Sequence, residues 1–285
     1  MEQYDILIIG GGAAGIAAAK AAQGAKILLV DNKPALGGIL LQCAHHGFGN
    51  NKSGTEYAAD LTEDFPQSIT LALDTTVLSV SVDRTALLCG RTFGRKTIGF
   101  SQLILAAGCR EIPIGALPIS GTRPKGIYTA GQMQEMMNLH GHLPKGPVVI
   151  LGSGDLGLIM AKQLAESGLC VTLVEQKNQC GGMAKNQRCL TAYPIGLLCD
   201  DTIAEIQGYP HITGCVTAKG VRLPCSTLLI AAGLIPEREL VMGLEGAPWL
   251  HICGNCRKVH PMVEAVINEG KQAGLAAWEQ LRGNL

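Results

Sequence analysis

Apolar runs of four to six residues recur along the chain, and glycines cluster directly after several of them. The first run, residues 6–9, is followed by three glycines, an Ala-rich segment and a second apolar run that ends at Asp31. Residues 147–175 repeat this order and end at Glu175. Strand, tight turn, helix and strand in this succession predict two βαβ units, and the periodicity predicts an α/β protein.

Both units carry the Gly-x-Gly-x-x-Gly fingerprint of dinucleotide binding, first at Gly10, Gly12 and Gly15 and then at Gly152, Gly154 and Gly157. The first glycine permits the tight turn, the second lets the backbone approach a pyrophosphate, and the third lets the helix pack closely on the strand. Phosphates are then expected at the helix N-terminus, where free amides and the dipole favour anions. One such motif is weak evidence, but its duplication with strand, helix and terminal acid makes a chance match remote.

A second repeat closes each unit. Residues 103–113 and 228–238 are apolar strands that end in Ala-Ala-Gly and a Pro-containing turn. Each is expected to be the last strand of its nucleotide-binding sheet. The remaining residues, 239–285, are too few for a domain of their own.

Composition excludes some classes of function. Lys and Arg together number 23, as do Asp and Glu, and without a run of like charge nucleic-acid and anionic-membrane binding get no support. The low charged fraction, 16%, favours contacts with another subunit. Eleven cysteines without a secretory signal indicate a reducing cytoplasm, where structural disulfides are rare. The apolar stretch at residues 6–19 is too short and too rich in glycine for a membrane span.

With these motifs, nearly all of the chain resembles the two-dinucleotide-binding-domain flavoproteins of the pyridine nucleotide-disulfide oxidoreductase superfamily, in the short form typified by thioredoxin reductase. The resemblance implies FAD on the first fingerprint and a nicotinamide nucleotide on the second. It also implies an NAD domain inserted into the FAD domain. The expected fold is therefore α/β with two Rossmann-like three-layer domains: residues 1–118 and 239–285 for FAD, and residues 119–238 for NAD.

The resemblance places FAD on the first fingerprint, the acidic strand end and the ends of later strands. The FAD-binding candidates are Gly10, Gly12, Ala13, Ala14, Gly15, Asp31, Asn32, Lys33, Gly38, Ile39, Gln42, Val77, Ala107, Gly108, Asn255, Pro261 and Met262. Asp31 is placed to accept hydrogen bonds from a ribose. Asn255 stands where the family has an Asp that bonds the ribityl chain, and an amide can still bond a hydroxyl. Pro261 is expected in the first turn of the last helix, with His260 and Met262 near flavin N1 and O2.

The nicotinamide nucleotide is expected at the second fingerprint and the strand ends beside it. Its candidates are Gly152, Gly154, Asp155, Leu156, Gly157, Glu175 and Gly233. A carboxylate at the end of the second strand bonds both ribose hydroxyls of NAD and repels a 2′-phosphate. Glu175 therefore favours NADH over NADPH. Lys177 leaves room for NADPH, but the arginine pair expected for it is absent.

Cys43 lies in residues 36–49, a segment that resembles a subgroup of FAD-dependent oxidoreductases encoded beside glycerol-3-phosphate-dehydrogenase-like subunits. The chain has no second cysteine for a dithiol at this place. One hypothesis is a single cysteine that cycles through a sulfenic acid or a mixed disulfide, with His45 or His46 favouring the thiolate. The alternative is packing beside the flavin. The candidate catalytic residues are Cys43, His45 and His260.

Cys253 and Cys256 form a Cys-x-x-Cys pair between His251 and His260. Three interpretations stay open: packing as small apolar side chains, a redox dithiol, or metal ligation. Packing is favoured, because a closed zinc site needs four ligands and the other cysteines lie in other segments. We expect no metal.

The predicted function is an FAD-dependent NAD(P)H oxidoreductase that passes a hydride between nicotinamide C4 and flavin N5, and on to an unidentified acceptor. The alternatives are an electron-transfer flavoprotein subunit of a heteromeric dehydrogenase and a flavin-binding scaffold or sensor without catalysis. We expect a cytoplasmic protein that forms a homodimer or joins a heteromeric dehydrogenase, and that has no membrane span.

Overall fold

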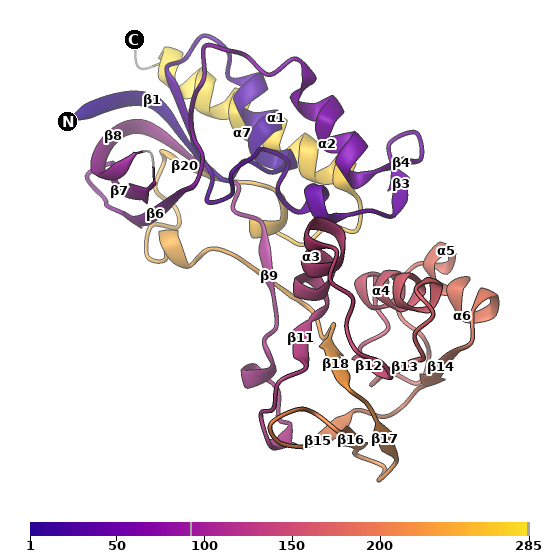
Figure 1. The fold of residues 1–285 in the computed structure, drawn as a ribbon. Coiled ribbons are helices and arrows are strands. Elements are labelled where there is room, and N and C mark those ends of the chain that lie inside the picture. The colour runs from indigo at the N-terminus through magenta and orange to yellow at the C-terminus, as the bar shows by residue number, and fades with distance from the viewer. Residues whose placement is uncertain (92, 284–285) are drawn as a thin grey trace. The chain divides into compact units, whose positions relative to one another are not determined.

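The computed structural model describes residues 1–91 and 93–283 (Figure 1). They form two compact units: unit 1 is Met1–Arg110 with Ile235–Leu285, and unit 2 is Glu111–Leu234. Unit 2 is thus inserted into the sequence of unit 1. The assignment of residues 1–118 and 239–285 to an FAD domain and of residues 119–238 to an NAD domain stays a prediction.

A seven-stranded sheet forms the centre of unit 1. Its strands are β1 (Glu2–Ile9), β2 (Ile27–Val30), β5 (Thr70–Ala72), β6 (Thr75–Val80), β7 (Thr85–Gly90), β8 (Gly94–Leu105) and β20 (Leu250–Ile252). The order is β5-β2-β1-β8-β7-β6, and β20 also pairs with β8. β1 is parallel to β2 and β8, and β20 is parallel to the end of β8, whereas β7 is antiparallel to both its neighbours. The carboxyl ends of β1, β2, β8 and β20 therefore share one edge, where open α/β sheets bind ligands.

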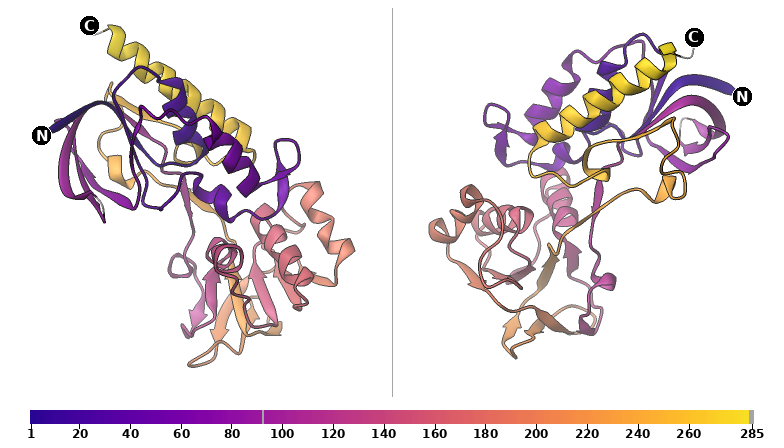
Figure 2. Two further views of the ribbon diagram at one scale, coloured as in Figure 1. Left: turned by 45° about the horizontal axis from the view of Figure 1, so that its top comes forward. Right: turned by 180° about the vertical axis from the view of Figure 1, so that it is seen from behind.

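Two helices, α1 (Ala13–Ala21) and α7 (Val263–Gly283), run side by side over one face of this sheet (Figure 2). They approach so closely that a Cβ on Gly270 would lie 2.1 Å from the backbone oxygen of Ala14, and one on Gly274 would lie 2.3 Å from that of Ala18. Because α1 is rich in alanine, its side chains leave room for this contact.

The smaller elements of unit 1 lie in the connection between β2 and β5 and on either side of β20 in the sequence. They are η1 (Gly38–Gln42), β3 (His46–Phe48), β4 (Lys52–Ser53), α2 (Gly54–Glu63), η3 (Glu239–Val241) and η4 (Gly254–Cys256). Helix α2 starts with a capping box, in which the Ser53 side chain accepts from the Glu56 amide and the Glu56 carboxylate accepts from the Ser53 amide.

Unit 2 is built on a five-stranded, fully parallel sheet in the order β11-β18-β12-β13-β14. Its strands are β11 (Ile127–Thr129), β12 (Val148–Leu151), β13 (Val171–Val174), β14 (Ile195–Leu198) and β18 (Thr227–Ile230). Its helices are α3 (Ala130–His140), α4 (Asp155–Glu166), α5 (Ala184–Gln187) and α6 (Cys189–Ala192). A smaller sheet contains β10 (Ser120–Gly121), β15 (Ile203–Gln207), β16 (Gly214–Thr217) and β17 (Arg222–Pro224). β9 (Cys109–Glu111) pairs with β19 (Leu234–Pro236), and η2 (Ile114–Ala116) follows β9.

The predicted α/β class is confirmed, and both predicted βαβ units are present as β1-α1-β2 and β12-α4-β13. One expected boundary is wrong. Helix α7 begins at Val263, so Pro261 and Met262 precede it instead of forming its first turn. The amide of His260 already donates to the Asn255 side chain, which ties this segment to the preceding turn instead of the helix.

Candidate cofactor-binding site

The first glycine loop of unit 1 joins β1 to α1. A Cβ on Gly10 would lie 2.4 Å from the backbone oxygen of Ala106, and one on Gly15 would lie 1.8 Å from that of Gly10. Only glycine therefore fits these two positions. In contrast, the nearest atom to a Cβ on Gly12 is 3.9 Å away, and within the described part of the chain no side chain caps α1 at this residue. The first amides of α1 are therefore available to an anion.

Asp31 ties this loop to the end of β2. Its Oδ2 atom accepts a hydrogen bond from the Gly11 amide at 2.5 Å, and its Oδ1 atom accepts one from the Lys33 amide at 2.8 Å. The amide of Gly37 donates to the backbone oxygen of Gly11 at 2.8 Å. The predicted residues of the loop, the acidic strand end and the following glycine pair therefore lie together.

A cavity of about 280 Å³ lies beside the loop within unit 1. Its lining includes five of the predicted FAD residues: Gly10, Asp31, Asn32, Val77 and Ala107. It also includes residues that the sequence analysis missed: Thr75, Thr76, Glu237 and Leu240. Glu237 lies in the second Ala-Ala-Gly turn, so that repeat was a signal for it, whereas the two threonines and Leu240 follow no motif. The cavity approaches the size of ligand pockets, about 300–1,000 Å³, and combines apolar walls with the Asp31 carboxylate.

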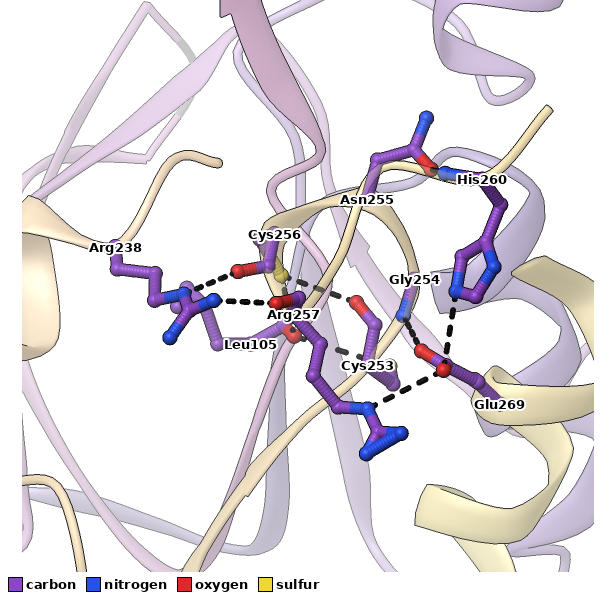
Figure 3. A network of polar contacts seen from close by, with 9 residues as sticks. All are labelled: Leu105, Arg238, Cys253, Gly254, Asn255, Cys256, Arg257, His260 and Glu269. Atoms are coloured by element: carbon purple, nitrogen blue, oxygen red, sulfur yellow. Dashed lines mark hydrogen bonds and ion pairs between the residues drawn. The ribbon is translucent and has the colours of Figure 1, made fainter. Parts of the chain in front are cut away.

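The segment after β20 contains the Cys-x-x-Cys pair (Figure 3). The thiol of Cys256 donates to the backbone oxygens of Leu105 at 3.1 Å and Cys253 at 3.0 Å. Cys253 is 1% exposed and Cys256 is fully buried. Burial raises the pKa of both thiols, so both are neutral near neutral pH. These surroundings support the packing interpretation over a reactive dithiol. Among the residues that the structure describes, no three His, Cys, Asp or Glu side chains form a metal-binding group.

Asn255 and His260 come together in this segment. The Oδ1 atom of Asn255 accepts from the His260 amide at 3.0 Å, and His260 Nε2 lies 3.0 Å from the Glu269 carboxylate. Two other predicted FAD residues are apolar and exposed to solvent. Met262, which follows His260 by two residues, is 42% exposed, and Ile39, in η1, is 62% exposed.

Cys43 is buried next to η1, and its thiol donates to the backbone oxygen of Ile39 at 3.3 Å. Burial raises the pKa of this thiol to about 12. The thiol is therefore neutral near neutral pH, the opposite of the thiolate that the catalytic hypothesis needs. The His45 ring packs against Phe48, with the ring centroids 5.1 Å apart.

The glycine loop of unit 2 repeats the design of the first. A Cβ on Gly152 would lie 2.3 Å from the backbone oxygen of Ala231, and one on Gly157 would lie 2.2 Å from that of Gly152. A Cβ on Gly154 would meet no described atom within 4 Å, and in the described residues no side chain caps α4 there. The start of α4 can therefore also accept an anion.

Glu175 ties the second loop to the end of β13. Its Oε2 atom accepts from the amide of Ser153 at 2.8 Å and from the hydroxyl of Ser153 at 2.6 Å, while its Oε1 atom accepts from the Lys177 amide at 3.0 Å. Burial acts to raise the pKa of Glu175, but these hydrogen bonds outweigh it and hold the pKa below its ordinary value. The carboxylate is therefore ionised.

Other predicted nucleotide-binding residues of unit 2 make contacts within the unit itself. The Oδ1 atom of Asp155 accepts hydrogen bonds from within the chain, from the Met183 amide at 2.7 Å and from the Asn186 side chain at 2.6 Å. Leu156 packs against the core around α4, and Gly233 follows β18 with a positive φ of 130°.

A glycine pair in unit 2 was missed. Gly181 and Gly182 follow Glu175 at the same spacing as Gly37 and Gly38 follow Asp31. The amide of Gly181 donates to the Ser153 hydroxyl at 2.8 Å. The repeated spacing of acid and glycine pair was the signal in the sequence.

Two glycine loops, each tied to an acidic strand end, define a protein with two dinucleotide-type sites. The family model described as pyridine nucleotide-disulphide oxidoreductase matches residues 4–251, and the chain belongs to this family of FAD-dependent oxidoreductases. Membership implies binding of FAD and of a pyridine nucleotide, and it confirms the resemblance seen in the sequence.

Curated relatives include an opine oxidase subunit of Agrobacterium tumefaciens (strain Ach5), 32% identical over 58% of this chain and 35% of its own length. Hydrogen cyanide synthase subunit HcnB of Pseudomonas protegens is 27% identical over 84% of this chain and 59% of its own length. The chain spans about half the length of the curated relatives it matches. Among solved structures, thioredoxin reductase of T. acidophilum has a TM-score of 0.80 at 19% identity, covering 98% of this chain and 99% of its own, which shows a shared fold. Across the described residues, no helix has both the length and the apolar character needed to cross a membrane.

Proposed function

We propose that this chain is an NADH-dependent FAD oxidoreductase, with FAD held by unit 1 and the nicotinamide nucleotide held by unit 2. The observation that carries the proposal is the duplicated loop. In each unit, among the residues that the structure describes, a helix starts without a side-chain cap, beside a carboxylate at the end of the neighbouring strand. A pyrophosphate suits the uncapped helix start, and a ribose suits the carboxylate.

In unit 1, FAD would be held by the glycine loop, Asp31 and the turn after β20. The cavity beside Asp31 suits the adenosine half of the cofactor. Asn255 uses its Oδ1 atom within the turn, so its Nδ2 group is the donor suited to a ribityl oxygen. The exposed side chains of Ile39 and Met262 offer apolar surface to the flavin ring.

In unit 2, Glu175 supports NADH over NADPH. Its ionised carboxylate accepts three hydrogen bonds from the chain, and its remaining acceptor capacity suits ribose hydroxyls. A 2′-phosphate would meet this negative charge, and like charges brought together are unfavourable. Gly181, joined to Ser153, would complete the loop around the nucleotide.

When both cofactors are bound, they supply hydride transfer between nicotinamide C4 and flavin N5. The protein would position the two cofactors, and its buried cysteines would take no part in the reaction. Burial holds Cys43, Cys253 and Cys256 as neutral thiols, which are poor nucleophiles.

A second candidate is an electron-transfer subunit of a heteromeric dehydrogenase. Two of the relatives are themselves subunits of larger enzymes, one of opine oxidase and one, HcnB, of hydrogen cyanide synthase. In this case the final acceptor would lie on a partner protein. The partner is a proposal from these names and from the low charged fraction of 16%.

An anaerobic titration tests the function. We expect NADH to bleach the visible absorbance of the FAD-loaded protein at concentrations about tenfold or more below those needed with NADPH, because of the Glu175 charge. Glu175→Gln should narrow this preference, whereas Glu205→Gln, at an exposed acid of the same unit, should leave it unchanged. A protein that binds FAD but is not reduced by either nucleotide would contradict the proposal. Turnover with small acceptors supports the self-contained enzyme, and bleaching without turnover supports the role in a heteromeric dehydrogenase.

A further inference from the structure

Glu269 lies in α7 and directs its carboxylate to the turn that follows β20 (Figure 3). The carboxylate accepts from the amide of Gly254 at 2.9 Å and pairs with Arg257 Nε at 3.2 Å, and its Oε1 atom lies 3.0 Å from His260 Nε2. Its side chain is 15% exposed. One side chain thus contacts the beginning, the middle and the end of the turn.

The backbone of this turn is tightly folded. Gly254 adopts a positive φ of 69°, and a Cβ there would lie 2.9 Å from the Cβ of Ala14 in α1. The amides of Arg257 and Lys258 both donate to the backbone oxygen of Gly254, at 2.8 and 3.1 Å. The amide of Gly254 itself points to Glu269, which satisfies a partly buried donor.

Arg238 holds the other side of the same turn. Its Nε atom donates to the backbone oxygen of Cys256 at 2.6 Å, and its Nη2 atom donates to that of Arg257. Asn255 lies between these two sets of contacts, and its side chain accepts from the amide of His260. The positions of Asn255 and His260 therefore depend on groups that carry no motif for a cofactor.

We propose that Glu269 is a positioning residue for the flavin site, and this rests on the function proposed above. Its carboxylate holds the 254–260 turn in the conformation that presents Asn255 and His260 to FAD before the cofactor binds. A site that is ordered beforehand loses less conformational freedom on binding, so affinity is gained without a direct contact. Removing the carboxylate leaves the Gly254 amide and Arg257 Nε without their common acceptor.

The test compares Glu269→Ala, Glu269→Gln and, as a matched control, Glu279→Ala, which removes an exposed carboxylate from the same helix. FAD is titrated into each apoprotein, and both its dissociation constant and the visible bands of the bound flavin are measured. We expect Glu269→Ala to raise the dissociation constant by about tenfold or more, as for one lost hydrogen bond to a charged group, and to shift the bands. Glu269→Gln should recover part of the affinity, because its amide oxygen can still accept from Gly254. Glu279→Ala should match the wild type.

Circular dichroism of the apoproteins separates folding from positioning. If Glu269→Ala does not fold, Glu269→Gln decides: a dissociation constant raised by about threefold or more supports the proposal, and an unchanged one overturns it. With folded variants, the proposal is overturned if Glu269→Ala binds FAD like the wild type with the same bands, or if Glu269→Gln binds no better than Glu269→Ala. A wild-type protein that binds no FAD overturns the proposed function instead, so the two failures are distinguishable.

Discussion

At the scale of single residues, the cysteines differ from one another in how far their thiols are buried. Cys43, Cys253 and Cys256 are buried, whereas Cys89 and Cys170 are exposed. A thiol reacts through its thiolate, and burial in apolar surroundings disfavours that charged form. Sequence position beside a cofactor motif is therefore a poor guide to thiol reactivity here.

This difference predicts a pattern of alkylation. With iodoacetamide at about pH 8, Cys89 and Cys170 should be modified rapidly while Cys43 stays unmodified, because little thiolate forms that far below a pKa of about 12. Peptide mass spectrometry measures each site in one sample, so the exposed thiols are the internal control. Raising the pH towards 12 should increase the modification of Cys43. Equal rates for Cys43 and Cys89 at the lower pH would restore the thiolate hypothesis.

At the scale of secondary-structure elements, the close contact between α1 and α7 fixes the helix whose Glu269 binds the Gly254 amide. The contact depends on glycine at two positions of α7, where the backbone of α1 fills the space of a Cβ. Helix α7 also carries Glu269, so its position along α1 sets the position of that carboxylate. Its packing and the proposed cofactor site are therefore linked.

Substituting Gly270 by Ala tests this contact. Alanine favours a helix over glycine by about 1 kcal/mol, so the local effect is stabilising. Its Cβ would, however, lie 2.1 Å from the Ala14 backbone oxygen, and overpacking of this kind costs about 1–3 kcal/mol. We expect a lower unfolding temperature for Gly270→Ala by calorimetry. Gly283→Ala is the control, because a Cβ at Gly283 meets no described atom within 4 Å. Equal unfolding temperatures for the two variants would mean that α7 moves to accommodate the Cβ without loss of stability.

At the scale of the whole molecule, the two units repeat one βαβ design with a glycine loop, and each adds different strands and turns to it. Unit 1 adds β6 and β7 and the turn after β20. Unit 2 adds the smaller sheet of β10, β15, β16 and β17 and the 181–186 segment, which Ser153 and Asp155 hold by hydrogen bonds. If each unit binds its own cofactor, each cofactor should protect a separate set of backbone amides.

Hydrogen exchange followed by mass spectrometry measures this separation. FAD should slow exchange in residues 10–15, 31–42 and 253–260, because the ordered cofactor suppresses local opening there. NADH should slow exchange in residues 152–157 and 175–183. Residues 203–224, in β15, β16 and β17, are the control that neither ligand should change. Protection of the second loop by FAD, or of the first by NADH, would contradict the assignment of cofactors to units.

The sequence by itself determined the class of fold, the two βαβ units and their glycine loops, because those features depend on neighbours within about thirty residues of chain. It also indicated Asp31 and Glu175, whose hydrogen bonds run to their own loops. The tertiary structure alone decided the burial of Cys43, the Thr75 and Leu240 walls of the cavity and the contact of Glu269 with Gly254. These depend on which distant segments pack together, and that packing carries no local pattern of residues.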